Sequence, residues 1–224
     1  MNGNGNHASV AGAGFEAARR EMAARQIRDR GVRSERVLAA MESVPRHLFV
    51  PPAQVPRAYA DEALPIGEGQ TISQPYIVAA MADALALEGH ERVLEVGAGS
   101  GYLAAVLSLL AREIIAVEAV PALAVSARER LARLGYANVL VEQGDGSEGW
   151  PAGAPFDAIV VSAAAPRIPQ PLIAQLTQGG RLVVPVGMTE QQQLLRVVSS
   201  NGGTAEQSLV ACRFVPLVGR YGWR

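Results

Sequence analysis

VLEVGAGSG, residues 93–101, is the stretch that decides the fold of this chain. Its first four residues are apolar except for Glu95 and are typical of a buried strand, and three glycines follow at alternate positions. Glycines at that point let the backbone turn sharply and approach a ligand closely. The dinucleotide fingerprint G-x-G-x-x-G needs glycine at position 102, where this chain has Tyr102, so NAD and FAD are disfavoured. The stretch predicts a strand and a cofactor-binding turn, although the glycines alone also fit a plain turn that binds nothing.

Strand and helix patterns alternate outward from this stretch. The apolar spacing predicts strands over 92–96, 113–118, 138–142, 157–162 and 181–186, separated by helices over 75–87, 101–111, 121–134 and 170–176. Strands over 193–199 and 207–214 are joined by SNGGT, which is typical of a hairpin. Apolar strands that alternate with helices favour a parallel sheet covered on both faces. We therefore expect an α/β fold with a doubly wound, mostly parallel, seven-stranded Rossmann-like sheet and an antiparallel edge hairpin.

The residues before this alternation have a different composition. Residues 1–14 are rich in Gly, Asn and Ala and are predicted to form a flexible tail. One helix is predicted over 15–30, stopped by Gly31, and a second from the N-cap residue Ser34 to Pro45. The stretch 49–74 is rich in Pro and Gly, has no sustained period and predicts a long extended loop, a kind of segment that is usually functional.

These segments predict one domain over residues 15–224. Within it we expect the N-terminal helices and a loop for substrate and cofactor over 15–74, and a cofactor-binding core over 75–187. A C-terminal hairpin and substrate segment follows over 188–224.

The composition excludes several kinds of chemistry. The 224 residues are 49% hydrophobic, which is enough for a sizeable core. All 20 basic residues are Arg, so a P-loop lysine and a Schiff-base lysine are both ruled out. A net charge of -1 disfavours nucleic acid as a partner, and one cysteine with three scattered histidines predicts no metal site. The sequence has no export signal or apolar membrane span, which indicates a cytoplasmic protein without a membrane partner.

Acidic residues follow the strands next to the glycine turn. Glu118 ends the strand 113–118, and Asp145 follows the next strand in Gly-Asp-Gly. Because parallel strands end at one edge of the sheet, both should lie beside the glycines. Glu118 suits a pair of ribose hydroxyls, Asp145 an adenine amino group, and Glu95 a cationic group such as a sulfonium or an ammonium. Each carboxylate could instead cap a turn or a helix.

At this point the chain resembles the class I methyltransferases that use S-adenosylmethionine. From about Arg19 to Trp223 it is similar to the protein-L-isoaspartate O-methyltransferase family. The most specific motif is LPIGEGQTISQP, and the shared segments are RHLFVP (46–51), AYADEALPIGEGQTISQPYIVAAM (58–81), VLEVGAGSGYLAAVLS (93–108), GYANVLVEQGDGSEGW (135–150), FDAIVVSAAAPRIPQPLIAQLTQGGRLVVPVG (156–187) and RFVPLVG (213–219).

The resemblance implies roles for individual residues. It places the hydroxyl of Ser73 at the reacting carboxylate as the catalytic group, although Ser73 could equally cap the helix that begins near Pro75. It has Val215 help to hold the substrate carboxylate through its backbone. The cofactor-binding residues that it implies are Thr71, Ile72, Ser73, Glu95, Gly97, Ala98, Gly99, Gly101, Glu118 at the ribose, and Asp145 with Gly146 near the adenine.

The resemblance also implies an activity. A methyl group would pass from S-adenosyl-L-methionine to the α-carboxylate of L-isoaspartyl residues in age-damaged proteins and peptides, leaving S-adenosyl-L-homocysteine and starting repair to aspartate through a succinimide. The enzyme would act as a monomer. One alternative is a related methyltransferase that acts on an aspartate of a peptide natural product or on another small acid. A second alternative is a binding module that has kept the cofactor fold and lost turnover.

Overall fold

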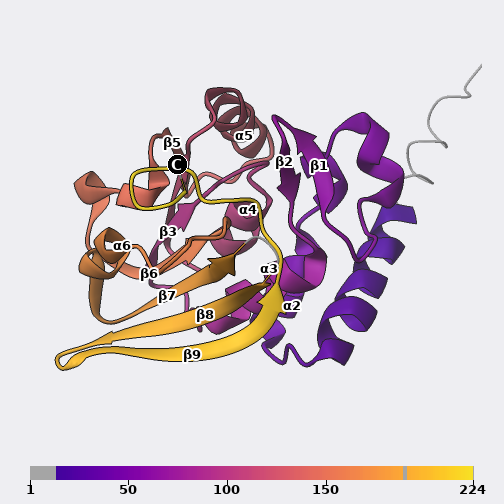
Figure 1. Ribbon diagram of the computed structural model, residues 1–224. Coiled ribbons are helices and arrows are strands. Elements are labelled where there is room, and N and C mark those ends of the chain that lie inside the picture. Colours follow the sequence, from indigo (N-terminus) through magenta and orange to yellow (C-terminus); the bar gives the residue numbers. More distant parts are fainter. Residues whose placement is uncertain (1–13, 189–190, 224) are drawn as a thin grey trace, which may run out of the picture.

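Seven strands form a single sheet in the computed structural model, which describes residues 14–188 and 191–223 (Figure 1). The order across the sheet is β5-β4-β3-β6-β7-β8-β9, and its first five strands pair in parallel. β8 and β9 pair antiparallel and form the predicted edge hairpin. The mostly parallel, doubly wound sheet is confirmed, with strands β3 (Arg92–Val96), β4 (Glu113–Glu118), β5 (Val139–Gln143), β6 (Phe156–Val161), β7 (Leu176–Met188), β8 (Gln191–Ser200) and β9 (Gly203–Cys212).

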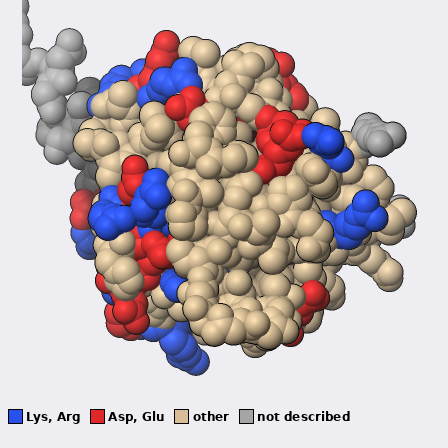
Figure 2. Space-filling model, turned by 90° about the vertical axis from the view of Figure 1, so that its left-hand side faces the viewer, with Lys and Arg blue, Asp and Glu red and all other residues tan. Residues whose placement is uncertain are grey.

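Two apolar layers cover the faces of the sheet. The side chains of β3 alternate between them, so that Val93 packs with the larger layer and Leu94 with the smaller one. The larger layer contains α2 (Glu35–Ser43), α3 (Pro75–Ala84), α4 (Tyr102–Ser108) and α5 (Pro121–Arg133). The smaller layer lies under α6 (Gln170–Ala174), and the surface on that side of the molecule carries few charged side chains at its centre (Figure 2). Among the described residues, no helix is both long and apolar enough to cross a membrane.

α6 is shorter than the helix predicted over 170–176. It ends at Ala174, because Leu176 already pairs with Phe156 as the first residue of β7. β7 consequently runs through to Met188, whereas the apolar pattern predicted a strand over 181–186 only. The glycines at 179 and 180 hid the start of this strand in the sequence.

The N-terminal segment contains the two predicted helices. Residues 14–21 are α-helical and continue as a π-helix over Met22–Ile27 and a 3-10 turn over Arg28–Arg30, which Gly31 ends with a φ of 102°. The side chain of Ser34 caps α2 by accepting the Val37 N–H at 3.4 Å. The tail predicted over 1–14 lies outside the described residues except for Gly14, which is helical.

The stretch 49–74 is more ordered than the predicted extended loop. The 3-10 turns η3 (Arg46–Phe49) and η4 (Pro52–Arg57) precede an antiparallel hairpin of β1 (Leu64–Gly67) and β2 (Gln70–Ile72). Glu68 and Gly69 form its turn, and these two residues and Gly67, the last residue of β1, have positive φ angles. The prediction was wrong here because the hairpin is too short to show an alternating pattern, although Gly-Glu-Gly between two short apolar runs is a turn signal.

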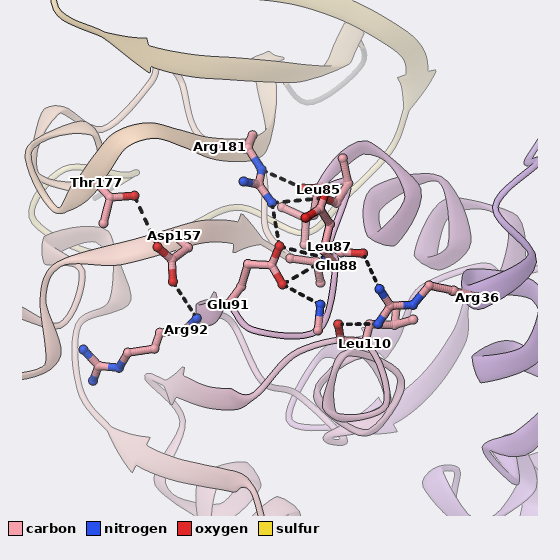
Figure 3. A network of polar contacts seen from close by, with 12 residues as sticks. Arg36, Leu85, Leu87, Glu88, Glu91, Arg92, Leu110, Asp157, Thr177 and Arg181 are labelled. Atoms are coloured by element: carbon pink, nitrogen blue, oxygen red, sulfur yellow. Dashed lines mark hydrogen bonds and ion pairs between the residues drawn. The ribbon is translucent and has the colours of Figure 1, made fainter.

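A buried polar network closes the sheet at the amino end of β3 (Figure 3). The carboxylate of Glu91 accepts the backbone N–H groups of Glu88 and Gly89, at distances between 2.8 and 3.0 Å, and lies 3.3 Å from the guanidinium of Arg181. Arg181 also donates to the carbonyl of Leu85 at 2.8 Å, just after α3. The network therefore satisfies both a buried carboxylate and a free helix-end carbonyl at this end of the sheet.

Candidate functional site

An open pocket of about 910 Å³ lies at the carboxyl ends of β3 and β4. The hairpin β1–β2, the glycine turn, the end of β4 and the C-terminal segment all reach it. It brings together most of the site residues that the sequence predicted, namely Thr71, Ile72, Ser73, Glu95, Gly97, Ala98, Gly99, Glu118, Gly146 and Val215. Gly101 and Asp145 do not line it.

The glycine turn is shaped by backbone angles that favour glycine. Gly97, Gly99 and Gly101 have φ angles of 88°, 53° and 85°. Gly101 precedes α4, and a Cβ on it would lie 3.0 Å from Leu131 of α5. Gly101 therefore supports the close packing of α4 on α5, whereas Gly97 and Gly99 present their backbone to the pocket.

Glu95 is the least satisfied acid in the pocket. Its side chain is 1% exposed, and its Oε2 atom has no hydrogen-bond partner among the described residues. Burial raises the pKa of Glu95 well above its ordinary value, and the nearby charge of Glu118 raises it further. A buried carboxyl group without a partner is costly unless a ligand satisfies it, and a cation is the ligand that it would favour.

Glu118 fixes the glycine turn to the end of β4. One carboxylate oxygen accepts the Gly99 N–H at 2.7 Å, and the other accepts the Val120 N–H at 2.9 Å. Each carboxylate oxygen can accept a further hydrogen bond. Glu118 therefore has an acceptor left for each of two ligand hydroxyls while it holds the turn in place.

Asp145 caps the next turn. Its Oδ1 accepts the N–H and the hydroxyl of Ser147 at 2.9 and 2.6 Å, and its Oδ2 accepts the Arg220 N–H at 2.7 Å. Burial by itself raises the pKa of Asp145, but these hydrogen bonds outweigh it and hold the pKa below its ordinary value. The capping alternative is therefore present, and the contact with adenine stays a prediction. Within the described ranges, no group of three or more His, Cys, Asp or Glu residues is placed to hold a metal ion.

Ser73 lies where the hairpin meets α3. The N-cap residue of α3 is Gln74, and no side chain makes a capping hydrogen bond there, so Ser73 does not cap this helix. The carbonyl of Ser73 instead accepts a hydrogen bond of 2.8 Å from Arg46, which is fully buried. Arg46 could not be singled out from the sequence, because an arginine side chain is ordinarily expected to be exposed.

A second groove, open and about 1520 Å³ in volume, joins the pocket at four shared residues. These are Thr71, Ser73, Ser162 and Val215. The carbonyl of Val215 accepts the Ala164 N–H at 2.8 Å, which fixes the C-terminal segment beside the end of β6. Sequence reasoning missed Ser162, although its position at the end of the strand predicted over 157–162 is the signal that found Glu118 and Asp145.

Comparisons with known proteins agree with this geometry. A family model described as protein-L-isoaspartate(D-aspartate) O-methyltransferase matches residues 18–222. A protein-L-isoaspartate O-methyltransferase from Methanoculleus marisnigri is 55% identical over 206 residues, which are 92% of this chain and 94% of that protein. A protein-L-isoaspartate O-methyltransferase 1 from Syntrophobacter fumaroxidans is 53% identical over 209 residues, covering 93% and 98% of the two chains.

Solved structures show the same fold. A protein-L-isoaspartate O-methyltransferase superposes with a TM-score of 0.82 at 28% identity and covers 91% of this chain and 67% of its own. A Plasmodium falciparum protein described as a protein-L-isoaspartate O-methyltransferase in complex with S-adenosyl-L-homocysteine superposes with a TM-score of 0.75 at 24% identity, covering 89% and 98% of the two chains.

Proposed function

The chain belongs to the protein-L-isoaspartate(D-aspartate) O-methyltransferase family, and from this membership we propose how its pocket and groove carry out the reaction. It is a methyltransferase that uses S-adenosyl-L-methionine and methylates isoaspartyl residues of proteins and peptides. The observation that carries the assignment of roles is the continuity of the two cavities. The pocket around the unpaired carboxyl group of Glu95 opens at Ser73 into a groove large enough for a polypeptide segment.

The pocket residues fit the cofactor. When bound, S-adenosyl-L-methionine supplies a methyl group carried on a cationic sulfur. The unpartnered Oε2 of Glu95 suits a cationic part of that molecule, and the free acceptor positions of Glu118 suit the ribose hydroxyls. We assign the remaining contacts to the backbone of the glycine turn and its neighbours, namely Thr71, Ile72, Gly97, Ala98, Gly99 and Gly146, with Asp145 near the adenine and Gly101 supporting the turn.

Ser73 serves the acceptor in this proposal. The α-carboxylate of an isoaspartyl residue has an ordinary pKa of about 4 and is ionised at neutral pH, so it needs no general base. This agrees with the described residues that line the pocket, none of which is a histidine. The Ser73 hydroxyl and the backbone of Val215 would replace water around the carboxylate and hold one oxygen toward the methyl group. Catalysis here is orientation and desolvation rather than proton transfer.

The second groove accounts for selectivity. An isoaspartyl residue routes the main chain through its β-carboxyl group, which leaves the α-carboxylate as a short branch. A normal aspartyl residue also has a free carboxylate, but a methylene group separates it from the main chain, whereas the α-carboxylate of isoaspartate is bonded directly to a main-chain carbon. A groove that fixes the path of the main chain would therefore place only the isoaspartyl carboxylate correctly at the shared residues. A buried Gln192 fixes one wall of the groove by accepting the Phe214 N–H at 2.7 Å and donating to the Phe214 carbonyl at 3.3 Å.

Methylation starts a repair in this proposal. The amide nitrogen of the next residue attacks the methyl ester, methanol leaves, and a succinimide forms without the enzyme. Water then opens part of the succinimide to normal aspartate. We propose a monomeric, cytoplasmic enzyme in which residues 15–224 act as one domain on polypeptides, with no nucleic-acid or membrane partner.

A matched pair of peptides tests the function. One peptide carries isoaspartate and the other normal aspartate at the same position, and both are incubated with methyl-labelled cofactor. We expect base-labile label on the isoaspartyl peptide alone, and a much lower rate in Ser73→Ala.

Two outcomes would contradict the proposal separately. Label on neither peptide, with cofactor binding intact, would overturn the acceptor and leave the cofactor assignment standing. An unchanged rate in Ser73→Ala would overturn the role of Ser73 alone.

A further inference from the structure

Arg46 is a buried cation without a counter-ion. Its side chain is 0% exposed, and burial lowers the pKa of its guanidinium. None of the ion pairs formed among the described residues includes Arg46. Its Nη1 atom is buried and has no hydrogen-bond partner there. Because an unpaired buried charge is costly, stability alone does not explain an arginine at this position.

The contacts of Arg46 connect the two parts that form the pocket. Its Nε donates to the carbonyl of Ala58 at 2.8 Å, and its Nη2 donates to the carbonyl of Ser73 at 2.8 Å. These two carbonyls lie on either side of the hairpin β1–β2, so the guanidinium holds both ends of the hairpin segment. Its central carbon lies 4.9 Å from the ring centre of Tyr102, the first residue of α4 after the glycine turn.

We propose that Arg46 is a positioning residue for methyl transfer: it holds the Ser73 carbonyl, and through it the Ser73 hydroxyl, at a fixed place relative to the glycine turn. This rests on the function proposed above. The planar guanidinium provides two parallel donors at a fixed spacing, which one flexible lysine ammonium does not reproduce. In this proposal the buried guanidinium of Arg46 is retained because the position of Ser73 determines the rate of methyl transfer.

Arg181 provides a matched control. It also donates to two backbone carbonyls, those of Leu85 at 2.8 Å and Ala86 at 3.1 Å, but it does so at the opposite end of the sheet and pairs with Glu91. We would compare Arg46→Lys and Arg46→Gln with Arg181→Lys, each in the full chain. The measurements are kcat and KM for the isoaspartyl peptide, the cofactor Kd and the unfolding temperature.

We expect kcat to fall about tenfold or more in Arg46→Lys, because a displacement of about 1 Å at a reacting group can cost about a hundredfold in rate. The cofactor Kd should change by less than about threefold, the size of a contact worth well under 1 kcal/mol. Arg181→Lys should lower the unfolding temperature and leave kcat unchanged. In the Ser73→Ala background, the additional loss from Arg46→Lys should disappear, because both changes then act on the same hydroxyl.

Three results would overturn the proposal. The first is an unchanged kcat in both Arg46 variants. The second is a pair of losses from Arg46→Lys and Ser73→Ala that multiply independently, and the third is a loss of kcat in Arg181→Lys as large as that in Arg46→Lys.

Amide hydrogen exchange over residues 58–74 tests, without a substrate, whether Arg46 holds this segment in place. Faster exchange there in Arg46→Lys, but not in Arg181→Lys, supports positioning, and equal exchange in both contradicts it. Failure of the wild-type chain to methylate the peptide would contradict the proposed function, and the exchange result would still decide the role of Arg46.

Discussion

Two glutamates at opposite ends of β3 are equally buried and have opposite surroundings. Glu91 lies just before the strand, and Glu95 is the second-to-last residue of the strand. Both are 1% exposed. Glu91 accepts two backbone N–H groups and pairs with Arg181. Burial by itself raises the pKa of Glu91, but the backbone hydrogen bonds outweigh it and hold the pKa below its ordinary value. Glu95 has an oxygen without any partner, and burial together with Glu118 raises its pKa.

The difference shows that partners, and not burial, distinguish a structural acid from a ligand-binding one. At the amino end of the strands the polar groups satisfy one another and close the fold (Figure 3). At the carboxyl end, the backbone turns away as a glycine loop and leaves carboxyl oxygens available in a pocket. Loss of the first kind of group should reduce stability, and loss of the second kind should reduce binding.

Glu91→Gln should have the largest effect, and it should act on the unfolding free energy. The change removes the anion that faces Arg181 and one acceptor for the backbone N–H groups of Glu88 and Gly89. We expect a loss of about 2–3 kcal/mol of unfolding free energy, as for a buried charge-assisted hydrogen bond. Thermal unfolding should show it as a decrease of about 4–12 °C, with the cofactor Kd unchanged. An unchanged unfolding temperature would show that the amino-end network is not structural.

Glu95→Gln should have the opposite pattern. Loss of a carboxylate that faces a cationic ligand should weaken cofactor binding at least about tenfold in calorimetry, which corresponds to about 1.4 kcal/mol. The free protein should become slightly more stable, because a neutral amide removes the unpaired carboxyl group beside Glu118. If Glu95→Gln destabilised the free protein as strongly as Glu91→Gln and left the cofactor Kd unchanged, both glutamates would be structural and the proposed difference between the two ends of β3 would be wrong.

The pH dependence of stability should separate the same two residues. Glu91 has a lowered pKa in the folded state. Its contribution to the unfolding free energy is therefore present above the unfolded-state pKa of about 4.3 and is lost as the pH falls through the folded-state pKa. Glu95 has a raised folded pKa, so the unfolded state loses its proton first and stability falls as the pH rises above about 4.3 toward the folded value. Urea unfolding at several pH values should therefore show the defect of Glu91→Gln shrinking in acid. The advantage of Glu95→Gln should grow as the pH rises.

Most of the strand framework could be predicted because the local pattern and the packing agree. The predicted strands 92–96 and 113–118 have the observed bounds, since each is an apolar run in the sheet interior. The carboxyl ends of neighbouring parallel strands must share an edge, which is why Glu95 and Glu118 could be predicted from the sequence to lie in one pocket.

Contacts between distant segments could not be predicted in this way. Arg46 reaches Ser73 only because the stretch between them folds back as a hairpin, and that hairpin is too short to give a pattern. The Arg220 N–H reaches Asp145 from 75 residues further along the chain. In both cases a polar side chain that suggests solvent or ligand forms hydrogen bonds with the backbone of another segment.

Asp145→Asn should have the smallest effect and would sharpen the boundary between the two kinds of acid. A carboxylate has about four acceptor positions, and three of those on Asp145 already receive hydrogen bonds from Ser147 and Arg220. One position is left for the adenine amino group, so we expect the preference for S-adenosylmethionine over its inosine analogue to fall only about threefold, a loss of under 1 kcal/mol. Ser147→Ala is the control, because it removes one donor to the carboxylate, the Ser147 hydroxyl, and leaves the carboxylate itself. If both variants weakened the two cofactors equally, Asp145 would be a structural cap like Glu91 although it lies at the ligand-binding edge, and position along the strands would no longer predict the role of an acid.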